Sequence, residues 1–433
     1  MTDETWIAAT LTAARPTAIG ALLRRFRDLD TAEEAFQEAC LRALKAWPVN
    51  GPPRDPAAWL IMVGRNAAVD RTRRTRREIP LPEDDALSDL DDAETPRIED
   101  LDHADYRDDV LRLLFVCGHP DLPATQQIAL ALRVVSGLSV SQIARAFLVS
   151  DAAMEQRITR AKVRVARADV PFAAPGAPER AERLAAVAAM LYLLFNEGYS
   201  ALGGAADLQG PLCGEAVRLT RLLLRLFPAE PEIMGLLALM QLQHARAAAR
   251  FDPDGEVIPM EEQDRGRWDQ RAIAEGLALV DKALRHGRPG AFQIQAAIAA
   301  AHARAKRPQQ TDWAQIDRLY AALEALQPSP VITLNRAVAV GKTQGPEAAL
   351  AMIEPLAPRL HAYYPYHGAR GAFLLQAGRR AEARVAFDQA IALAADAREV
   401  GHIRRHLDRL MADSELAAEK NRGVVGAPSP PTS

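Results

Sequence analysis

Apolar residues recur at helical spacing along almost the whole chain. Between scattered glycines and prolines lie stretches of about 10 to 20 residues that are rich in Ala, Leu, Arg and Glu. Few segments alternate apolar and polar residues, and clusters of β-branched residues are short. The pattern therefore predicts an all-α protein.

The segment from Thr31 to Trp47 shows this pattern most clearly. Thr31 occupies the expected N-cap position, and Pro48 is the first of several residues expected to end the helix. The predicted apolar stripe is Ala32, Ala35, Phe36, Ala39, Cys40, Ala43, Leu44 and Trp47. The predicted polar face carries Glu33, Glu34, Gln37, Glu38, Arg42 and Lys45. A second helix is predicted from about Pro56, with Trp59 inward, running into a cluster of arginines.

Charge is distributed unevenly, although 53 Lys and Arg nearly balance 56 Asp and Glu. Residues 65–77 hold six arginines and one aspartate, whereas residues 78–109 hold 14 acidic residues and two arginines. The near-neutral total excludes a uniformly basic coat but permits a local basic patch. The acidic stretch is typical of a flexible, self-repelling linker.

A helix-turn-helix pattern follows within residues 125–168. A helix at 126–135 precedes Gly137, and Ser139 with Gln142 forms a capping-box pattern that opens a short second helix. After a turn at Val149 and Ser150, a third helix is predicted from Asp151 to about residue 168. Its inward stripe is Met154, Ile158, Ala161 and Val165. Off this stripe lie Arg157, Arg160, Lys162 and Arg164, available to a DNA groove, with Gln156 and Thr159 able to reach base edges.

Two of these segments resemble known domains. The strings DTAEEAFQEACLRALKAW and DPAAWLIMVGRNAAVDRTRR resemble region 2 of the sigma-70 family, in its extracytoplasmic-function group. The resemblance implies that this region docks on a coiled coil in the largest subunit of core RNA polymerase through Glu34, Gln37, Glu38 and Arg42. It also implies that the −10 promoter element is handled by Trp59, Asn66, Asp70, Arg71, Arg73 and Arg74. From the residues alone, Trp59 is favoured as a core residue, and the arginines have a solvated face as their alternative.

The helix-turn-helix segment, GLSVSQIARAFLVSDAAMEQRITRAKVRV, resembles sigma region 4. The resemblance implies that its last helix reads the −35 element from the major groove. The corresponding residues are Ser150, Gln156, Arg157, Thr159, Arg160, Lys162 and Arg164. Glu155 and Gln156 stand where a lysine is often found in that family, so the base preference stays open.

The remaining C-terminal part is predicted to form recurring pairs of amphipathic helices. Residues 366–394 fit a tetratricopeptide repeat, with Gly371 small, Gly378 at the turn and Phe387 on the second helix. Strings such as FNEGYSA and EQDRGRWD resemble the C-terminal extension of one sigma subgroup, which implies a regulatory domain with a protein or peptide partner. A further set of polar residues is expected to form a buried ion-pair and hydrogen-bond network, with a small-ligand pocket as the alternative. The set is Asn196, Glu197, Tyr199, Gln263, Asp264, Arg265 and Trp268.

The predicted organisation has six parts. They are sigma region 2 (6–77), the acidic linker (78–104), sigma region 4 (105–169), a proline-rich linker (170–178), a tetratricopeptide-like helical domain (179–412) and a disordered tail (413–433).

We expect no catalytic residues, cofactor or metal. The three cysteines lie far apart without a CxxC pair, which argues against a zinc knuckle or a disulfide scaffold. No apolar run of 18 residues and no signal peptide are recognised, so no membrane association and a cytoplasmic location are expected. Two alternatives stay open: a helix-turn-helix regulator that acts without polymerase, and a tetratricopeptide-type scaffold for protein contacts.

Overall fold

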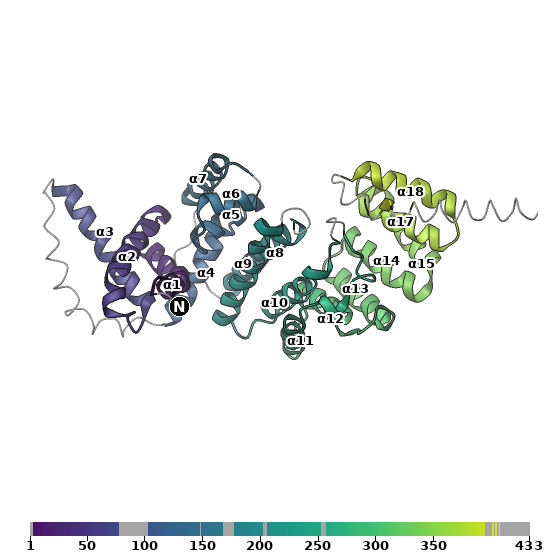
Figure 1. Cartoon of the computed structure of the whole chain (residues 1–433), viewed down its shortest axis with the longest axis horizontal. Coiled ribbons are helices and arrows are strands. Elements are labelled where there is room, and N and C mark those ends of the chain that lie inside the picture. Colours follow the sequence, from purple (N-terminus) through teal and green to yellow (C-terminus); the bar gives the residue numbers. More distant parts are fainter. Residues whose placement is uncertain are drawn as a thin grey trace, which may run out of the picture. The chain divides into compact units, whose positions relative to one another are not determined.

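The computed structural model describes residues 3–77, 103–147, 149–167, 177–201, 206–252 and 257–394, with residues 401, 403–404 and 407. Within these ranges the chain is helical, and its only β feature is an isolated bridge between Phe251 and Val257 (Figure 1). The predicted all-α class is therefore confirmed. The acidic linker up to residue 102 and the predicted tail lie outside the described residues.

The chain separates into two compact units. The first comprises Met1–Gly198 with Asp207–Leu226, and the second comprises Tyr199–Ala206 with Phe227–Ser433. Helices of the first unit are α1 (Asp3–Phe26), α2 (Leu29–Asn50), α3 (Pro56–Arg77), α4 (His103–Cys117), α5 (Ala124–Val134), α6 (Val140–Ala146), α7 (Asp151–Arg167), α8 (Ala177–Ala201) and α9 (Ala206–Leu226). Helices of the second unit are α10 (Pro231–His244), α11 (Gln270–Leu284), α12 (Ala291–Arg304), α13 (Trp313–Leu326), α14 (Pro330–Gln344), α15 (Pro346–Ile353), α16 (Ala357–Leu360), α17 (Tyr364–Gln376) and α18 (Arg380–Leu393).

Helices α1, α2 and α3 pack together as a small bundle. The ends of α2 differ from the prediction. Asp28 is the N-cap, and its carboxylate accepts hydrogen bonds from Thr31 N at 2.8 Å and Thr31 Oγ1 at 2.6 Å. The helix also continues through Pro48 to Asn50, and Gly51 caps it with a φ of 75°. Pro48 has no backbone N–H to donate within the helix, yet α2 continues for two more residues beyond it.

One flank of α2 corrects two predictions. Leu44, predicted inward, is 50% exposed, whereas Glu33, predicted on the polar face, is buried with a side chain only 6% exposed. Both residues lie beside the central stripe, where helical geometry alone does not decide burial. Neighbouring segments cover this flank near Glu33 and leave it exposed near Leu44.

Helix α4 packs along α1 at very close range. A Cβ atom at Gly20 in α1 would lie 2.8 Å from the carbonyl oxygen of Asp109 in α4, so only glycine fits there. Asp109 is itself buried and forms ion pairs with Arg24 of α1 at 3.2 Å and with Arg112 at 2.8 Å. This contact joins the α1–α3 bundle to the segment that carries the helix-turn-helix.

Helix α8 belongs to the first unit, although the sequence places it in the C-terminal domain that begins at residue 179. The buried Arg183 has its guanidinium carbon 5.0 Å from the centre of the Phe115 ring, and Arg180 pairs with Asp108 at 3.4 Å. A Cβ at Gly118 would lie 3.4 Å from the sulfur of Met190. These contacts attach the start of the C-terminal extension to α4.

The second unit is built from successive helical pairs. Helices α17 and α18 pack as an antiparallel hairpin whose turn contains Gly378 at a φ of 77° (Figure 1). Phe387 of α18 is buried against Gly371 of α17, where an added Cβ would lie 2.7 Å from the ring. The helical pair that the residue pattern predicted here is therefore confirmed.

In the second unit, Arg265 and Gln263 hold neighbouring segments together through backbone carbonyls. Arg265 donates hydrogen bonds of 2.6 Å to the carbonyls of His302 and Ala305, and its guanidinium lies 4.6 Å from the centre of the Trp268 ring. The buried Gln263 donates to the carbonyl of Ile258 at 2.9 Å. These contacts are hydrogen bonds to backbone carbonyls and one ring contact rather than the predicted ion pairs, and Asp264 is exposed.

Helix α1 is long and apolar. By length and composition the stretch Trp6–Phe26 is compatible with a membrane span, the one such stretch found in the described residues. However, Ile19, Leu22 and Leu23 are buried in the unit, where α1 packs against α2, α3 and α4. Core burial therefore accounts for the hydropathy of α1.

Candidate polymerase and nucleic-acid interface

The four residues predicted to contact polymerase share α2. Glu34 and Gln37 are exposed, and Glu38 and Arg42 are partly buried. The carboxylate of Glu38 accepts a hydrogen bond from Arg42 Nε at 3.2 Å, an i,i+4 pair along the helix. Because all four come from less than three turns of one helix, they form one continuous part of the surface of α2.

Two leucines extend this surface, and sequence reasoning did not assign them to it. Leu41 is 57% exposed and Leu44 is 50% exposed. Leu41 follows Gln37 by one turn, so the apolar and polar residues alternate along the same side of α2. Exposed large apolar side chains among polar ones are typical of protein interfaces. The sequence does contain a signal for them: with Leu41 and Leu44 included, the apolar stripe of α2 is wider than the core of a three-helix bundle requires.

The predicted −10 residues begin at a cluster of tryptophans. The Trp47 ring is buried, stacks on Trp6 with centroids 6.3 Å apart and meets Trp59 at 5.5 Å. Trp59 is partly buried, so one part of its ring packs on Trp47 as favoured for a core residue and another part stays accessible.

The remaining −10 residues follow along α3. Asn66 is partly buried, and the last turns of the helix carry Asp70, Arg71, Arg73 and Arg74. The helical backbone of these last four residues is described, but their side chains lie outside the described part of the structure. The basic cluster is thus presented by a regular helix that continues directly from Trp59.

The helix-turn-helix forms as predicted. Ser139 Oγ accepts a hydrogen bond from Gln142 N at 3.1 Å, and the Gln142 side chain accepts one from Ser139 N at 2.8 Å, which completes the capping box of α6. The inward stripe of α7 is confirmed, since every member is buried: Met154, Ile158, Ala161 and Val165. Ser150 precedes α7 and its Oγ accepts from Ala153 N at 3.3 Å.

The polar side of α7 is only partly available. Gln156, Thr159, Arg160 and Arg164 are exposed, and Arg157 is partly buried. Arg160 donates to Gln156 at 3.1 Å, and Arg164 donates to the carbonyl of Asp121 at 3.0 Å. Lys162 differs from the others because its side chain is only 19% exposed.

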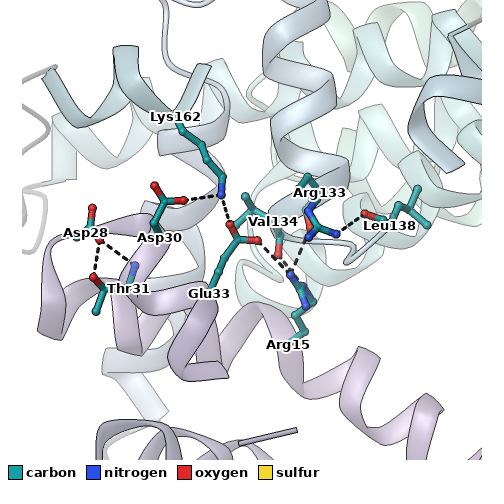
Figure 2. Close-up of polar contacts among 9 residues, drawn as sticks. All are labelled: Arg15, Asp28, Asp30, Thr31, Glu33, Arg133, Val134, Leu138 and Lys162. Carbon is teal, nitrogen blue, oxygen red and sulfur yellow. Dashed lines mark hydrogen bonds and ion pairs between the residues drawn. The ribbon is translucent and has the colours of Figure 1, made fainter. Parts of the chain in front are cut away.

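Lys162 is held by carboxylates from the start of α2 (Figure 2). Its Nζ lies 2.7 Å from Asp30 Oδ1 and 2.5 Å from Glu33 Oε2. Burial alone would lower the pKa of Lys162, but the hydrogen bonds to Asp30 and Glu33 outweigh burial and raise it. A residue predicted to bind DNA is therefore already bound to acidic groups of the same chain.

Arg15 of α1 makes a second connection beside the first (Figure 2). Its Nε donates to the carbonyl of Val134 at 2.8 Å, and its Nη2 lies 3.5 Å from Glu33 Oε1. Burial lowers the pKa of Arg15, against the opposing attraction of Glu33. Glu33 is thus a shared carboxylate between a cation from α1 and a cation from α7.

The described residues show no group of three or more His, Cys, Asp or Glu placed to hold a metal ion. Cys40, Cys117 and Cys213 are free thiols. Burial raises the pKa of Cys40 to about 11, an effect that nearby Arg15 partly offsets.

Comparison with known proteins identifies both DNA-facing domains. The model of sigma-70 region 2 matches residues 11–78, and the model of sigma-70 region 4 matches residues 117–165. The chain carries sigma-70 regions 2 and 4. The predicted resemblance to these two regions is thereby confirmed, and the Lys162 contact joins region 4 to region 2.

Two further comparisons match a part of the C-terminal extension and almost the whole chain. A family of unknown function, DUF6596, matches residues 183–284, which include most of α8 and continue through α11. An uncharacterized protein from Rhizobium meliloti (strain 1021) is 66% identical over 422 residues, covering 98% of this chain and 100% of that protein. The chain belongs to the same family as that protein. No solved structure matches the chain.

Proposed function

We propose that this chain is a promoter-specificity subunit of bacterial RNA polymerase, a sigma factor of the extracytoplasmic-function group. It binds core polymerase, directs it to a promoter and assists strand opening, and it carries out no chemistry itself. The observation that supports this most is the presence of sigma regions 2 and 4 in order on one chain, with Gln37 exposed on α2 and a polar helix face exposed on α7.

Polymerase binding is assigned to the exposed face of α2. Glu34, Gln37, Glu38 and Arg42 supply polar contacts to the coiled coil of the largest subunit, and Leu41 and Leu44 add apolar area between them. Such a face suits a helical partner because residues three and four apart in both helices can interdigitate. Loss of water from the two leucines contributes to affinity, and the polar residues set the register.

Promoter binding is assigned to two separate surfaces. In region 2, Trp59 and Asn66 hold unstacked bases of the −10 element, and the arginines of α3 follow its phosphates. In region 4, α7 enters the major groove at the −35 element. There Gln156 and Thr159 reach base edges, while Ser150, Arg157, Arg160, Lys162 and Arg164 contact phosphates or guanine.

The C-terminal helices are assigned a regulatory role. The helical pair α17–α18 supports a tetratricopeptide-like architecture, whose concave surface would bind a protein or peptide partner. We place this activity in the cytoplasm. The contacts of α8 with α4 set the boundary for a test: a chain ending at Leu226 keeps these contacts, and a chain ending at residue 178 loses them.

Truncation at Leu226 is expected to change transcription by the sigma part while leaving regions 2 and 4 folded. Truncation at residue 178 is expected to lower the melting temperature of the remaining unit, because Phe115 and Gly118 lose their cover. Thermal unfolding of both truncated chains measures the second effect. Equal melting temperatures would contradict the assignment of α8 to the first unit.

The function itself is tested by transcription in vitro. The full chain is added to core polymerase with a library of genomic promoter fragments, and transcript starts are mapped. We expect a defined set of starts that disappears with Arg157→Glu and Arg160→Glu and persists with Glu182→Lys, an exposed site on α8. No starts above core polymerase alone would favour a DNA-binding regulator that acts without polymerase. Starts that survive both arginine reversals would favour a scaffold.

A further inference from the structure

Two arginines of the second unit lie near each other at the end of α10. Arg246 follows this helix, and Arg265 begins the 3-10 helix η4 (Arg265–Arg267). The backbone N–H of Asp269 donates to the carbonyl of Ala245 at 2.9 Å, so the segment after η4 lies against the residue before Arg246. Burial lowers the pKa of Arg265, and the positive charge of Arg246 lowers it further. The two guanidinium groups therefore repel each other.

Both guanidinium groups contact neutral partners. Arg246 Nη2 donates to the hydroxyl of Tyr199 at 3.0 Å, and Arg265 Nη1 donates to the carbonyls of His302 and Ala305. Within the part of the chain that the structure describes, neither arginine forms an ion pair with a carboxylate. Two repelling cations without a counter-charge favour the binding of an anion.

The carboxylates close to this segment in sequence make other contacts. Asp264 accepts a hydrogen bond from the backbone of η4, and Asp269 caps the start of α11. Glu261 pairs with Lys342 of α14 at 2.8 Å. The ion pairs predicted for this region are thus replaced by local caps and by a pair that uses a different cation.

His302 of α12 adds a neutral polar group. Burial, together with the charges of Arg246 and Arg265, lowers the pKa of His302 to about 4, against a smaller opposing effect of Glu261. At pH 7 its imidazole is therefore uncharged and can donate one N–H to an anion. All three cluster members, Arg246, Arg265 and His302, are partly buried, so attraction to an anion is stronger than it is in open water.

Buried donors on the same short segment support this interpretation. The Nε of Arg265 and the Nε1 of Trp268 are buried, and among the described residues neither has a hydrogen-bond acceptor. Trp268 is only 4% exposed, and its ring centre lies 4.6 Å from the guanidinium of Arg265. Buried donors without acceptors are uncommon in folded proteins. An anion that binds at η4 is the kind of group that supplies acceptors.

We propose that Arg246, Arg265 and His302 form a binding site for the phosphate group of a small molecule. The two guanidinium groups carry two positive charges, and a phosphate monoester carries about 1.5 to 2 negative charges at pH 7. A phosphate therefore compensates both arginines, whereas one carboxylate leaves one of them uncompensated. Guanidinium groups also match phosphate oxygens through paired N–H donors.

Occupation of this site joins α10, η4 and α12, so the ligand stabilises the second unit. The inference adds a small-molecule ligand to the C-terminal extension and does not depend on promoter binding by regions 2 and 4.

The test uses the full chain with Arg246→Gln, which removes one guanidinium charge. The matched control is Arg285→Gln, an exposed arginine just beyond the end of α11. The 15 residues of α11 separate it by about 22 Å from Asp269, which lies beside the site. Isothermal titration calorimetry at constant ionic strength measures affinity for inorganic phosphate, phenyl phosphate and acetate. The basic surfaces of regions 2 and 4 are the same in both variants, so a difference between the variants reports on this site.

The unchanged chain should bind inorganic phosphate and phenyl phosphate more tightly than acetate. Arg246→Gln should weaken phosphate affinity by about tenfold or more, because a charge-assisted hydrogen bond is lost, and Arg285→Gln should leave it unchanged. Absence of phosphate binding, or equal affinity in the two variants, would overturn the site. Acetate binding as tight as phosphate binding would overturn its assignment to phosphate. Tighter binding of phenyl phosphate than of inorganic phosphate would identify a monoester as the ligand, and the reverse order would identify free phosphate.

A second variant protects the test against misfolding. If Arg246→Gln lowers the melting temperature of the ligand-free chain, Arg246→Lys keeps the charge and a donor for Tyr199 but removes the planar pair of N–H groups. Arg285→Lys is its control. A several-fold loss of phosphate affinity is expected in Arg246→Lys alone, and equal affinity in these two lysine variants would overturn the site.

Discussion

The polar faces of α2 and α7 carry the two main sets of proposed contacts, and they differ in how available they are. On α2, Gln37, Leu41 and Leu44 are exposed. On α7, Arg160 is exposed but Lys162 is held by carboxylates. The difference indicates that the same chain can offer one partner an open surface while it keeps part of another surface engaged.

The largest effect is expected at the close contact between α1 and α4, which joins the α1–α3 bundle to the segment that carries α7. Gly20→Ala should lower the free energy of unfolding of the first unit by about 2 kcal/mol, because the new Cβ would meet the backbone of Asp109 at 2.8 Å. Gly214→Ala on α9 is the matched control, since nothing lies within 4 Å of its Cβ position. There the better helix propensity of alanine should stabilise by about 0.5–1 kcal/mol. Urea unfolding measures both, and an equal change in the two variants would refute the close α1–α4 contact.

The open face of α2 is tested by Gln37→Ala combined with Glu38→Ala. Affinity for core polymerase should fall by about tenfold or more, as when residues central to an interface are truncated. Affinity for a duplex should stay the same because neither side chain belongs to a DNA-facing surface. A fluorescence titration with core polymerase gives the first value and a gel shift gives the second. Unchanged affinity for polymerase would contradict the proposal that this face of α2 binds it.

The partly engaged face of α7 is tested by comparing two cations. Arg160→Ala should reduce duplex affinity of the chain alone and lower the slope of log affinity against log salt by about 1, since one phosphate contact is lost. Lys162→Ala should have a smaller effect, because its carboxylate partners already occupy the ammonium group. The comparison is made by titration at several salt concentrations. A larger loss with Lys162→Ala would contradict the difference drawn between the two residues.

The smallest effect concerns the thiol on the flank of α2. Burial holds the pKa of Cys40 near 11, so its thiolate fraction at pH 8 is about one in a thousand. Alkylation by iodoacetamide should therefore be slow at pH 8 and rise about tenfold for each pH unit toward pH 11. Rates that level off near pH 9 would show an ordinary thiol and an uncovered flank.

Local patterns predicted those parts of the molecule whose partners are near in sequence. The stripe of α7 was predictable because α7 packs on α5 and α6, its neighbours in the chain, and Met154, Ile158 and Val165 are buried. The capping box at Ser139 depends on residues three apart, and the α17–α18 hairpin depends on one turn. Burial in these elements follows from helical periodicity.

Contacts between distant segments were not predictable from the same patterns. Glu33 has the spacing of a surface residue, and its burial depends on Arg15 and on Lys162, more than a hundred residues away along the chain. Leu44 has the spacing of a core residue, yet no described segment covers it. Asp28 and Thr31 are both good N-cap residues, so the sequence did not decide between them. In the structure Asp28 is the N-cap, because its carboxylate accepts a hydrogen bond from Thr31 N.

The most direct measurement is whether the full chain forms a complex with core RNA polymerase freed of other sigma subunits. Size-exclusion chromatography of an equimolar mixture, with subunit quantitation of each fraction, gives the answer. The account predicts a single complex that contains one copy of the chain and that a second, known sigma subunit displaces. Elution of the chain apart from polymerase, with duplex binding intact, would contradict it.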